Sequence, residues 1–235
     1  MQTRRQKVRH TPQISLNLLG EFMESSFVRR RSILRQAKFP QDYIGPRYDP
    51  AQKAAARYLA GAPGDRQALE SEIEALLQGS AKSQWFKNRQ KLCAQALDCV
   101  LDLEASLKPD SLAVSIGCNR AHRVNIGGVS VIVMPDLLVH GAGRDGEFLG
   151  ALKFRYGKTN PISQEWAANS ATTLHQFVES LGDGDRRVDR RHCKVIDVFA
   201  GKVYEAPVSY SERRKDIEAA CWHIKEIWSR VRIKD

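Results

Sequence analysis

Residues 129–156 read VSVIVMPDLLVHGAGRDGEFLGALKFRY, and this stretch decides the predicted fold. Two apolar runs, 129–139 and 147–156, flank the glycine-rich segment 141–146, so we expect two β-strands joined by a turn. Asp136 lies inside the first run and Lys153 inside the second. A charge within an apolar strand is costly unless it has a partner such as a metal ion. We therefore look for chemistry in this pair of strands.

The composition is that of a globular domain. The chain has 235 residues, of which 42% are hydrophobic and 27% are charged, and these are ordinary globular values. No apolar run approaches the roughly 18 residues that a membrane helix needs, and no apolar signal core follows the basic N-terminus. We therefore expect a cytoplasmic protein with no membrane partner. The cysteines are odd in number and lack CxxC pairing, which predicts reduced thiols; they are Cys93, Cys99, Cys118, Cys193 and Cys221.

The periodicity changes along the chain from helical to extended. Helical spacing is found over 14–24, 26–37, 50–60, 65–77, 83–107, 163–181 and 211–231. Strand-like patterns occupy 112–116, 123–126, 129–139, 147–156, 195–199 and 202–206. We expect an α/β (α+β) fold with a central mixed four-stranded sheet flanked by helices. Residues 1–80 are predicted to form a basic, helical N-terminal extension, and residues 81–235 the α/β core with a C-terminal helix.

The positive charge is concentrated near the N-terminus. The net charge of the chain is +10, and residues 1–38 hold nine Lys or Arg against Glu21 and Glu24, a net of +7. A basic block of this kind suits a polyanion and predicts salt-dependent binding. Arg29, Arg30 and Arg31 share one expected helix, and we predict that they contact nucleic acid, DNA rather than RNA.

The placing of Pro135-Asp136 and Gly150-Ala-Leu-Lys153 on successive strands resembles the active-site hairpin of the PD-(D/E)xK nuclease superfamily. That superfamily's core runs helix, three strands, helix, strand, and the resemblance covers roughly residues 84–206. It implies that Asp136 is a catalytic metal ligand and that Lys153 holds the attacking water. Phosphodiester hydrolysis needs an activated water and a stabilised transition state, which one or two Mg²⁺ (or Mn²⁺) ions supply.

One residue departs from the superfamily's pattern, because Ala151 stands where an acid is expected. In the first interpretation Glu165, at the start of the following helix, replaces it, as in relatives with a relocated glutamate; Gln164 beside it is a possible accessory residue. In the second, Glu147 reaches the site, although it lies about 13 Å away along the strand. In the third, the fold binds without cleaving. The sequence leaves all three open.

Other residues are weaker candidates. Arg155 shares the face of Lys153 by strand alternation, and Lys158 follows in the next loop, so both are predicted to contact phosphates. Glu104 is one of several acids on the first core helix with a possible accessory role. The segment 141–146 fits GxGxxG, but a strand rather than a helix is expected after it, which argues against a dinucleotide site.

Three hypotheses about function follow. The first is a Mg-dependent nuclease, a hydrolase acting on DNA, with Asp136, Lys153 and Glu165 as catalytic residues and Asp136 and Glu165 as metal ligands. The second is a non-catalytic nuclease-fold DNA-binding or assembly subunit of a larger bacterial complex, with a homodimer also possible. The third is a helical DNA-binding head, residues 14–60, on an inert α/β body.

Overall fold

The computed structural model describes residues 7–40, 47–61, 66–80, 83–107, 112–117, 122–143, 146–182 and 186–233. Within these ranges the chain forms eight α-helices and two mixed β-sheets, one of five strands and one of three. The predicted mixed α/β class is confirmed. The central sheet has five strands rather than the predicted four, and the three-stranded sheet was not expected.

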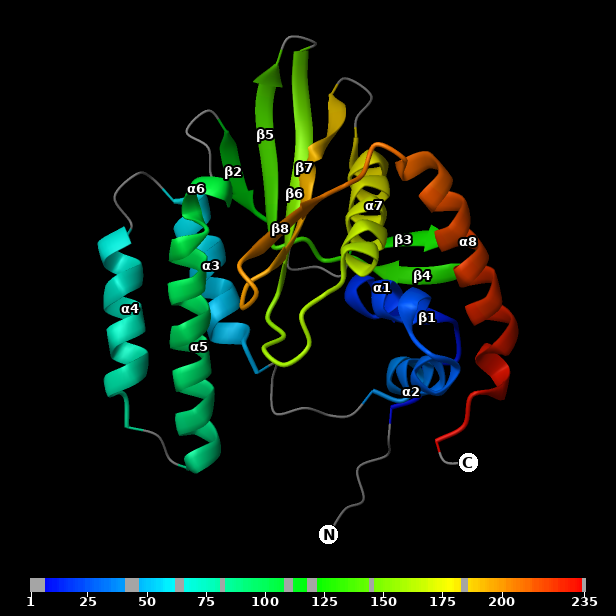
Figure 1. The fold of residues 1–235 in the computed structure, drawn as a ribbon, viewed down its shortest axis with the longest axis horizontal. Coiled ribbons are helices and arrows are strands. Elements are labelled where there is room, and N and C mark those ends of the chain that lie inside the picture. The colour runs from blue at the N-terminus through cyan, green and yellow to red at the C-terminus, as the bar shows by residue number, and fades with distance from the viewer. Residues whose placement is uncertain are drawn as a thin grey trace.

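The five-stranded sheet lies at the centre of the molecule (Figure 1). Its strand order is β2-β5-β6-β7-β8. All neighbours are antiparallel except β6 and β7, which are parallel and joined through helix α7 (Gln164–Leu181). The strands are β2 (Ala113–Ile116), β5 (Leu137–Gly143), β6 (Gly146–Arg155), β7 (Arg187–Asp197) and β8 (Lys202–Glu205).

The smaller sheet has the order β1-β4-β3, with β1 (Gln13–Ser15) parallel to β4 (Val129–Ile132) and β3 (Arg123–Ile126) antiparallel to it. The predicted continuous strand 129–139 is therefore wrong, since β4 and β5 belong to different sheets. Pro135 has no N–H for a strand ladder, and Met134 has a φ of 45°, so the backbone turns between them.

Asp136 accordingly lies just before β5 and not in the middle of a strand. The hairpin turn is also tighter than predicted. β5 continues to Gly143 and β6 begins at Gly146, while residues 144–145 at its tip lie outside the described ranges.

Helices cover both faces of the five-stranded sheet (Figure 1). Side chains of α1 (Leu16–Glu24), α2 (Phe27–Lys38), α7 and α8 (Tyr210–Ile227) form one core with the small sheet and with Leu149 and Ala151 of β6. The second core joins α3 (Asp49–Ala60), α4 (Arg66–Gln78) and α5 (Gln84–Asp102) to Leu152 and Phe154 of β6. Alternate residues of β6 thus enter opposite cores, which explains why Lys153 alone interrupts the apolar run from Phe148 to Phe154.

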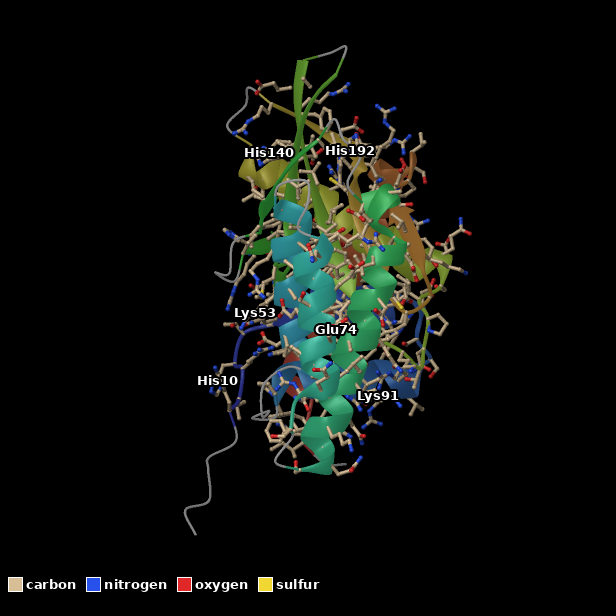
Figure 2. The ribbon with its side chains drawn as sticks, turned by 90° about the vertical axis from the view of Figure 1, so that its left-hand side faces the viewer. His10, Lys53, Glu74, Lys91, His140 and His192 are labelled. Carbon is tan, nitrogen blue, oxygen red and sulfur yellow. The ribbon has the colours of Figure 1, made fainter. Side chains whose placement is uncertain are left out.

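The helical layer of α3, α4 and α5 is charged on its outer side, where Lys53, Glu74 and Lys91 are exposed (Figure 2). The short helix α6 (Glu104–Leu107) follows α5. The division predicted at residue 80 remains a prediction.

The N-terminal segment is fastened to the C-terminal end of the chain. The buried Lys38 Nζ donates to the carbonyl oxygens of Trp228 at 2.7 Å and Val231 at 3.1 Å. Trp228, which begins the 3₁₀ turn η1 (Trp228–Arg230), donates its indole N–H to the carbonyl of Arg9 at 3.2 Å. Residues separated by almost the whole chain therefore hold each other in place.

None of the helices in the described ranges combines the length and the apolarity that crossing a bilayer requires. Cys93, Cys99, Cys193 and Cys221 are free thiols, and Cys118 lies outside the described residues. Burial raises the pKa of the Cys193 and Cys221 thiols to about 12, so neither is a reactive thiolate.

Candidate functional site

Asp136 and Lys153 face each other where β5 begins. The antiparallel register pairs Leu137 with Leu152, so the next positions outward place Asp136 opposite Lys153. The Asp136 N–H continues the ladder by donating to the Leu152 carbonyl at 2.9 Å. Lys153 Nζ lies 3.1 Å from Asp136 Oδ2, and only 1% of the aspartate side chain and 11% of the lysine side chain are exposed. The two residues singled out in the sequence form one buried ion pair.

Each polar atom of this pair has a further partner. Asp136 Oδ2 also accepts the backbone N–H of Phe154 at 2.7 Å. Its Oδ1 accepts from the amide Nε2 of Gln52, which α3 brings over the pair. Lys153 Nζ donates in addition to the Met134 carbonyl at 2.6 Å. The carboxylate therefore receives hydrogen bonds at both oxygens, as a buried charge requires.

The segment before Asp136 is held in an unusual conformation. Met134 has a positive φ of 45°, which a residue with a side chain seldom adopts, and its carbonyl points to Lys153. Gly117 packs against this segment, because its N–H donates to the Asp136 carbonyl at 2.9 Å and a Cβ on Gly117 would overlap Pro135. Strained backbone of this kind concentrates at functional sites.

The positions considered for completing a metal site with Asp136 have other surroundings in the structure. Ala151 is fully buried in the core beneath α7. Glu165 has 63% of its side chain exposed, and its Oε2 forms an ion pair with Arg213 of α8 at 2.8 Å. Gln164 starts α7 beside it. Glu147 pairs in register with Ala142 near the hairpin tip, far along β6 from Lys153.

The predicted magnesium set is therefore not assembled. Within the described part of the chain, no group of three or more His, Cys, Asp or Glu residues could hold a metal ion. Mg²⁺ needs accessible carboxylate oxygens, and Asp136 gives both of its oxygens to protein donors. As arranged, these side chains do not fit a resident metal ion.

Arg155 belongs to a second buried pair, two residues beyond Lys153 along β6. It lies opposite Asp197 of β7, and its Nη1 is 3.3 Å from Asp197 Oδ2. Asp197 is fully buried, and its Oδ2 also accepts the N–H of Ile162 at 2.8 Å. The Arg155 guanidinium lies 4.8 Å from the ring centroid of Trp166 and donates to the Asn160 carbonyl. This arginine therefore organises the start of α7 from within the protein.

The remaining predicted contacts are distributed over three regions. Lys158 Nζ donates to Gln95 Oε1 of α5 at 2.8 Å. Glu104 forms an ion pair with Arg66 at 3.2 Å, in the layer of α4 and α5. Neither is joined to Asp136 or Lys153 by a contact in the described structure.

The three arginines of α2 have separate surroundings. Arg29 pairs with Glu21 at the surface. Arg30 donates to the carbonyls of Phe22 and Met23, both at 2.8 Å, and so caps the C-terminus of α1. Arg31 borders a groove between α2 and α8. Their predicted role in nucleic-acid binding stays a prediction.

Two features of the site region are absent from the predictions made from the sequence. Gln52 lies in an alanine-rich helix, and nothing local indicates that it reaches Asp136 across a long sequence separation. The predicted strand at 195–199 begins in fact at Arg187, and its first half carries pairs of arginines that line a pocket. Repeated arginine pairs at 186–187 and 190–191 were the available signal for this pocket.

No protein-family model matches this chain, and no curated protein shows significant sequence similarity to it.

Proposed function

We propose that this chain is a nuclease-like module that binds nucleic acid, DNA in the first place, without cleaving it. The observation that carries the proposal is that the Asp136–Lys153 pair is buried and that other groups of the protein occupy its hydrogen-bonding positions. A metal-dependent nuclease needs carboxylate oxygens that face a cation and a lysine that faces water or phosphate. Here Gln52 and the Phe154 N–H donate to the Asp136 carboxylate, and the Met134 carbonyl accepts from Lys153.

The order of the elements supports the nuclease-like part of the proposal. The resemblance predicts a helix, three strands, a helix and a strand. The chain offers α5, then β2, β5 and β6, then α7 and β7, with the β3–β4 hairpin inserted after β2. Asp136 lies immediately before the second of these strands and Lys153 lies on the third, and the buried Ala151 stands where the resemblance predicts an acid.

The charge of the chain supports the nucleic-acid part. A net charge of +10 attracts polyanions at long range and gives affinity that falls as salt concentration rises. Contacts of this kind are made to phosphates, so the proposal implies little preference for base sequence. The proposal is also compatible with a role as an assembly subunit, since a DNA-binding module can bring a larger complex to DNA.

A second candidate, a metal-dependent nuclease, is favoured by one observation. The 3.1 Å approach of Lys153 Nζ to Asp136 Oδ2 puts a carboxylate and a lysine within reach of one shared water or phosphate. For this function Gln52 would have to leave Asp136, and a second carboxylate, such as Glu165 after release from Arg213, would have to approach.

The test combines binding and cleavage on the same preparations. Fluorescence anisotropy measures the affinity of the wild type for labelled single- and double-stranded DNA, and for RNA of the same sequence, over a salt series. The same substrates are then incubated with Mg²⁺ or Mn²⁺ and examined for cleavage. Asp136→Asn, Lys153→Met and Glu165→Gln, each checked for folding by circular dichroism, are the matched variants.

We expect salt-dependent binding by the wild type, no cleavage with either metal, and similar binding by the folded variants. Cleavage by the wild type that Asp136→Asn abolishes would instead establish the second candidate. Absence of binding to every substrate would contradict the proposal itself.

A further inference from the structure

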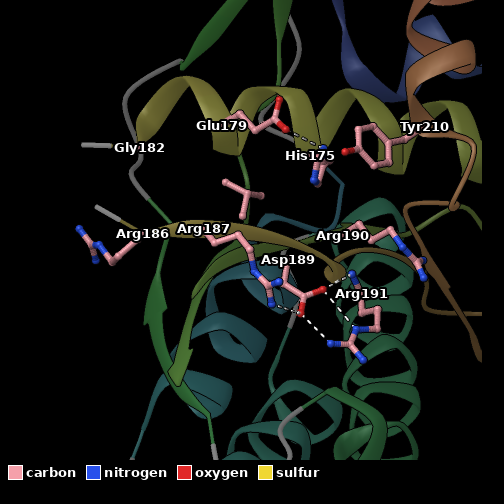
Figure 3. A pocket seen from close by; sticks show the side chains of 10 residues that line it. His175, Glu179, Gly182, Arg186, Arg187, Asp189, Arg190, Arg191 and Tyr210 are labelled. Atoms are coloured by element: carbon pink, nitrogen blue, oxygen red, sulfur yellow. Dashed lines mark hydrogen bonds and ion pairs between the residues drawn. The ribbon is translucent and has the colours of Figure 1, made fainter. Parts of the chain in front are cut away.

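A pocket of about 700 Å³ lies between the C-terminal half of α7, the first half of β7 and the start of α8 (Figure 3). Its lining includes Arg186, Arg187, Arg190, Arg191, His175 and Tyr210. None of these residues belongs to the Asp136–Lys153 pair. The volume is in the range of sites that hold small ligands or part of a larger one.

A buried carboxylate orients the arginines on β7. Asp189 is 7% exposed, and its Oδ1 accepts the backbone N–H of Arg191 at 2.9 Å. Its Oδ2 accepts from Arg191 Nη2 at 3.0 Å and lies 3.9 Å from Arg187 Nη2. Arg190 Nη1 donates to the Ala206 carbonyl at 3.0 Å. Figure 3 shows Arg187 and Arg191 below the strand on either side of Asp189, with Arg190 to their right.

Among the described residues, the pocket is lined by more arginines than carboxylates. Arg187, Arg190 and Arg191 lie on β7, and Arg186 immediately precedes it. From α8, Arg214 Nη2 lies 2.6 Å from Glu179 Oε2 and 2.7 Å from His175 Nδ1. In the part of the chain that the structure describes, four arginines and two carboxylates, Asp189 and Glu179, line the pocket, and Arg214 lies beside Glu179 and His175. Arg187 and Arg191 leave 50% and 62% of their side chains exposed, so both can approach a bound molecule.

The chemistry of these cations favours phosphate. All five are arginines, whose planar fork pairs with two oxygens of one phosphate, and a lysine in the same place would act only as a point charge. The two arginine pairs are four residues apart, which corresponds to about 13 Å along an extended strand at about 3.3 Å per residue. That spacing suits several phosphates in succession better than a single carboxylate.

We propose that this arginine pocket holds phosphate groups of a nucleic-acid strand. The inference rests on the proposed function and deepens it, because it names the surface where the backbone is held. The ring of Tyr210, 4.6 Å from that of His175, gives the pocket an aromatic wall beside the cations. Bases are often held by stacking on such rings.

The test reverses two charges in the pocket and two elsewhere. The variant Arg187→Glu/Arg191→Glu is compared with Arg57→Glu/Arg66→Glu, which makes the same change in net charge on α3 and α4. Arg57 and Arg66 are 60% and 55% exposed, and each has a glutamate partner, as the pocket arginines have Asp189. Affinity for a labelled single-stranded oligonucleotide of about 12 nucleotides is measured by anisotropy over a salt series.

We expect the pocket variant to lose at least about tenfold in affinity and its salt slope to shrink by about 1.4, since each lost phosphate contact removes about 0.7. The control variant should stay close to the wild type. Equal losses in the two variants, or none in either, would overturn the pocket assignment and leave the proposed function standing.

Two further probes separate this inference from failure of the proposed function. Tripolyphosphate should raise the melting temperature of the wild type and of the control variant, but not that of the pocket variant. Stabilisation by tripolyphosphate without oligonucleotide binding would overturn the nucleic-acid assignment in favour of a small phosphate compound. Polyglutamate that competes as well as DNA would overturn the assignment to phosphate.

Discussion

At the scale of single residues, the molecule depends on charges that have been taken out of water. Asp136 and Lys153 are tolerated because they pair with each other and because Gln52, Phe154 and Met134 satisfy their other hydrogen bonds. A buried ion pair adds little stability compared with an apolar pair of the same volume, yet removal of one partner leaves the other charge uncompensated. Each residue of the pair therefore constrains the other.

We expect Lys153→Met to lower the free energy of unfolding by about 3 kcal/mol, because the Asp136 carboxylate then remains buried without its cation. Urea denaturation followed by fluorescence measures the change. The double variant Asp136→Asn/Lys153→Met should recover part of the loss, since no charge is left behind. A single substitution that costs as little as an exposed lysine such as Lys91 would contradict this account.

His175 gives the stability a pH dependence. Burial lowers its pKa below the usual value near 6.5, and Arg214 Nη2 donates to its Nδ1 at 2.7 Å, which requires a neutral ring. Glu179 and Asp189 act in the opposite direction, but the lowering prevails. Below a pH of about 6.5 the unfolded chain then binds more protons than the folded one, so the stability present above that pH is lost as the pH falls.

The measurement is urea denaturation at several pH values between about 7.5 and 5. We expect the unfolding free energy to fall with pH in the wild type and to fall less in His175→Asn. His192 also has a pKa lowered by burial and contributes with the same sign, so a residual dependence should remain. An unchanged slope in His175→Asn would assign the whole dependence to other groups.

At the scale of elements, α1 and α7 pack closely at Gly20. A Cβ at this position would overlap the indole of Trp166 and the hydroxyl of Ser170, both on α7. Trp166 also donates its indole N–H to the Asn17 carbonyl at 3.0 Å, so its ring has little freedom to move aside. The glycine is therefore required by packing, although it weakens the helix that contains it.

Gly20→Ala thus sets two effects against each other. Alanine favours the helix by about 1 kcal/mol, while overpacking of a closed contact costs about 1–3 kcal/mol. We expect a net loss of roughly 1 kcal/mol in unfolding free energy. In a Trp166→Leu background the same substitution should cost less, and a double-mutant cycle measures the difference. Equal costs in the two backgrounds would remove the indole as the cause.

The elements also show what the sequence could predict. Helices with clear apolar spacing and the hairpin of β5 and β6 follow from local patterns, and the hairpin register brought Asp136 and Lys153 together as expected. Hydrophobicity does not predict the break at Met134, because the residues on both sides of it are apolar. The first half of β7 was missed because its arginines point into the pocket and to solvent, so the run lacks the apolar alternation of a strand.

Partners from distant segments could not be predicted from such patterns. The amide of Gln52 reaches Asp136 only because α3 packs over the sheet, and Glu165 turns to Arg213 only because α8 lies beside α7. The spacing of Glu165 from Lys153 specifies its place along α7 but not the cation that it meets.

At the scale of the whole molecule, Lys38 joins the first and last parts of the described chain. Lys38→Met removes the buried ammonium that accounts for hydrogen bonds to the Trp228 and Val231 carbonyls and leaves those oxygens without their donor. We expect the unfolding free energy to drop by about 2 kcal/mol. Hydrogen exchange should quicken around η1, whereas Lys91→Met on the exposed side of α5 (Figure 2) should change neither quantity.

The pairing of β1 with β4 has a consequence for how the protein is made. Residues 13–15 emerge from the ribosome long before residues 130–132, the strand that completes their ladder. Lys38 gains its hydrogen bond to the Trp228 carbonyl later still, after residue 228 has been synthesised. The nascent chain therefore carries β1 without its partner strand until residues 130–132 have been synthesised, and an unpaired strand edge of this kind is exposed to chaperones and to aggregation.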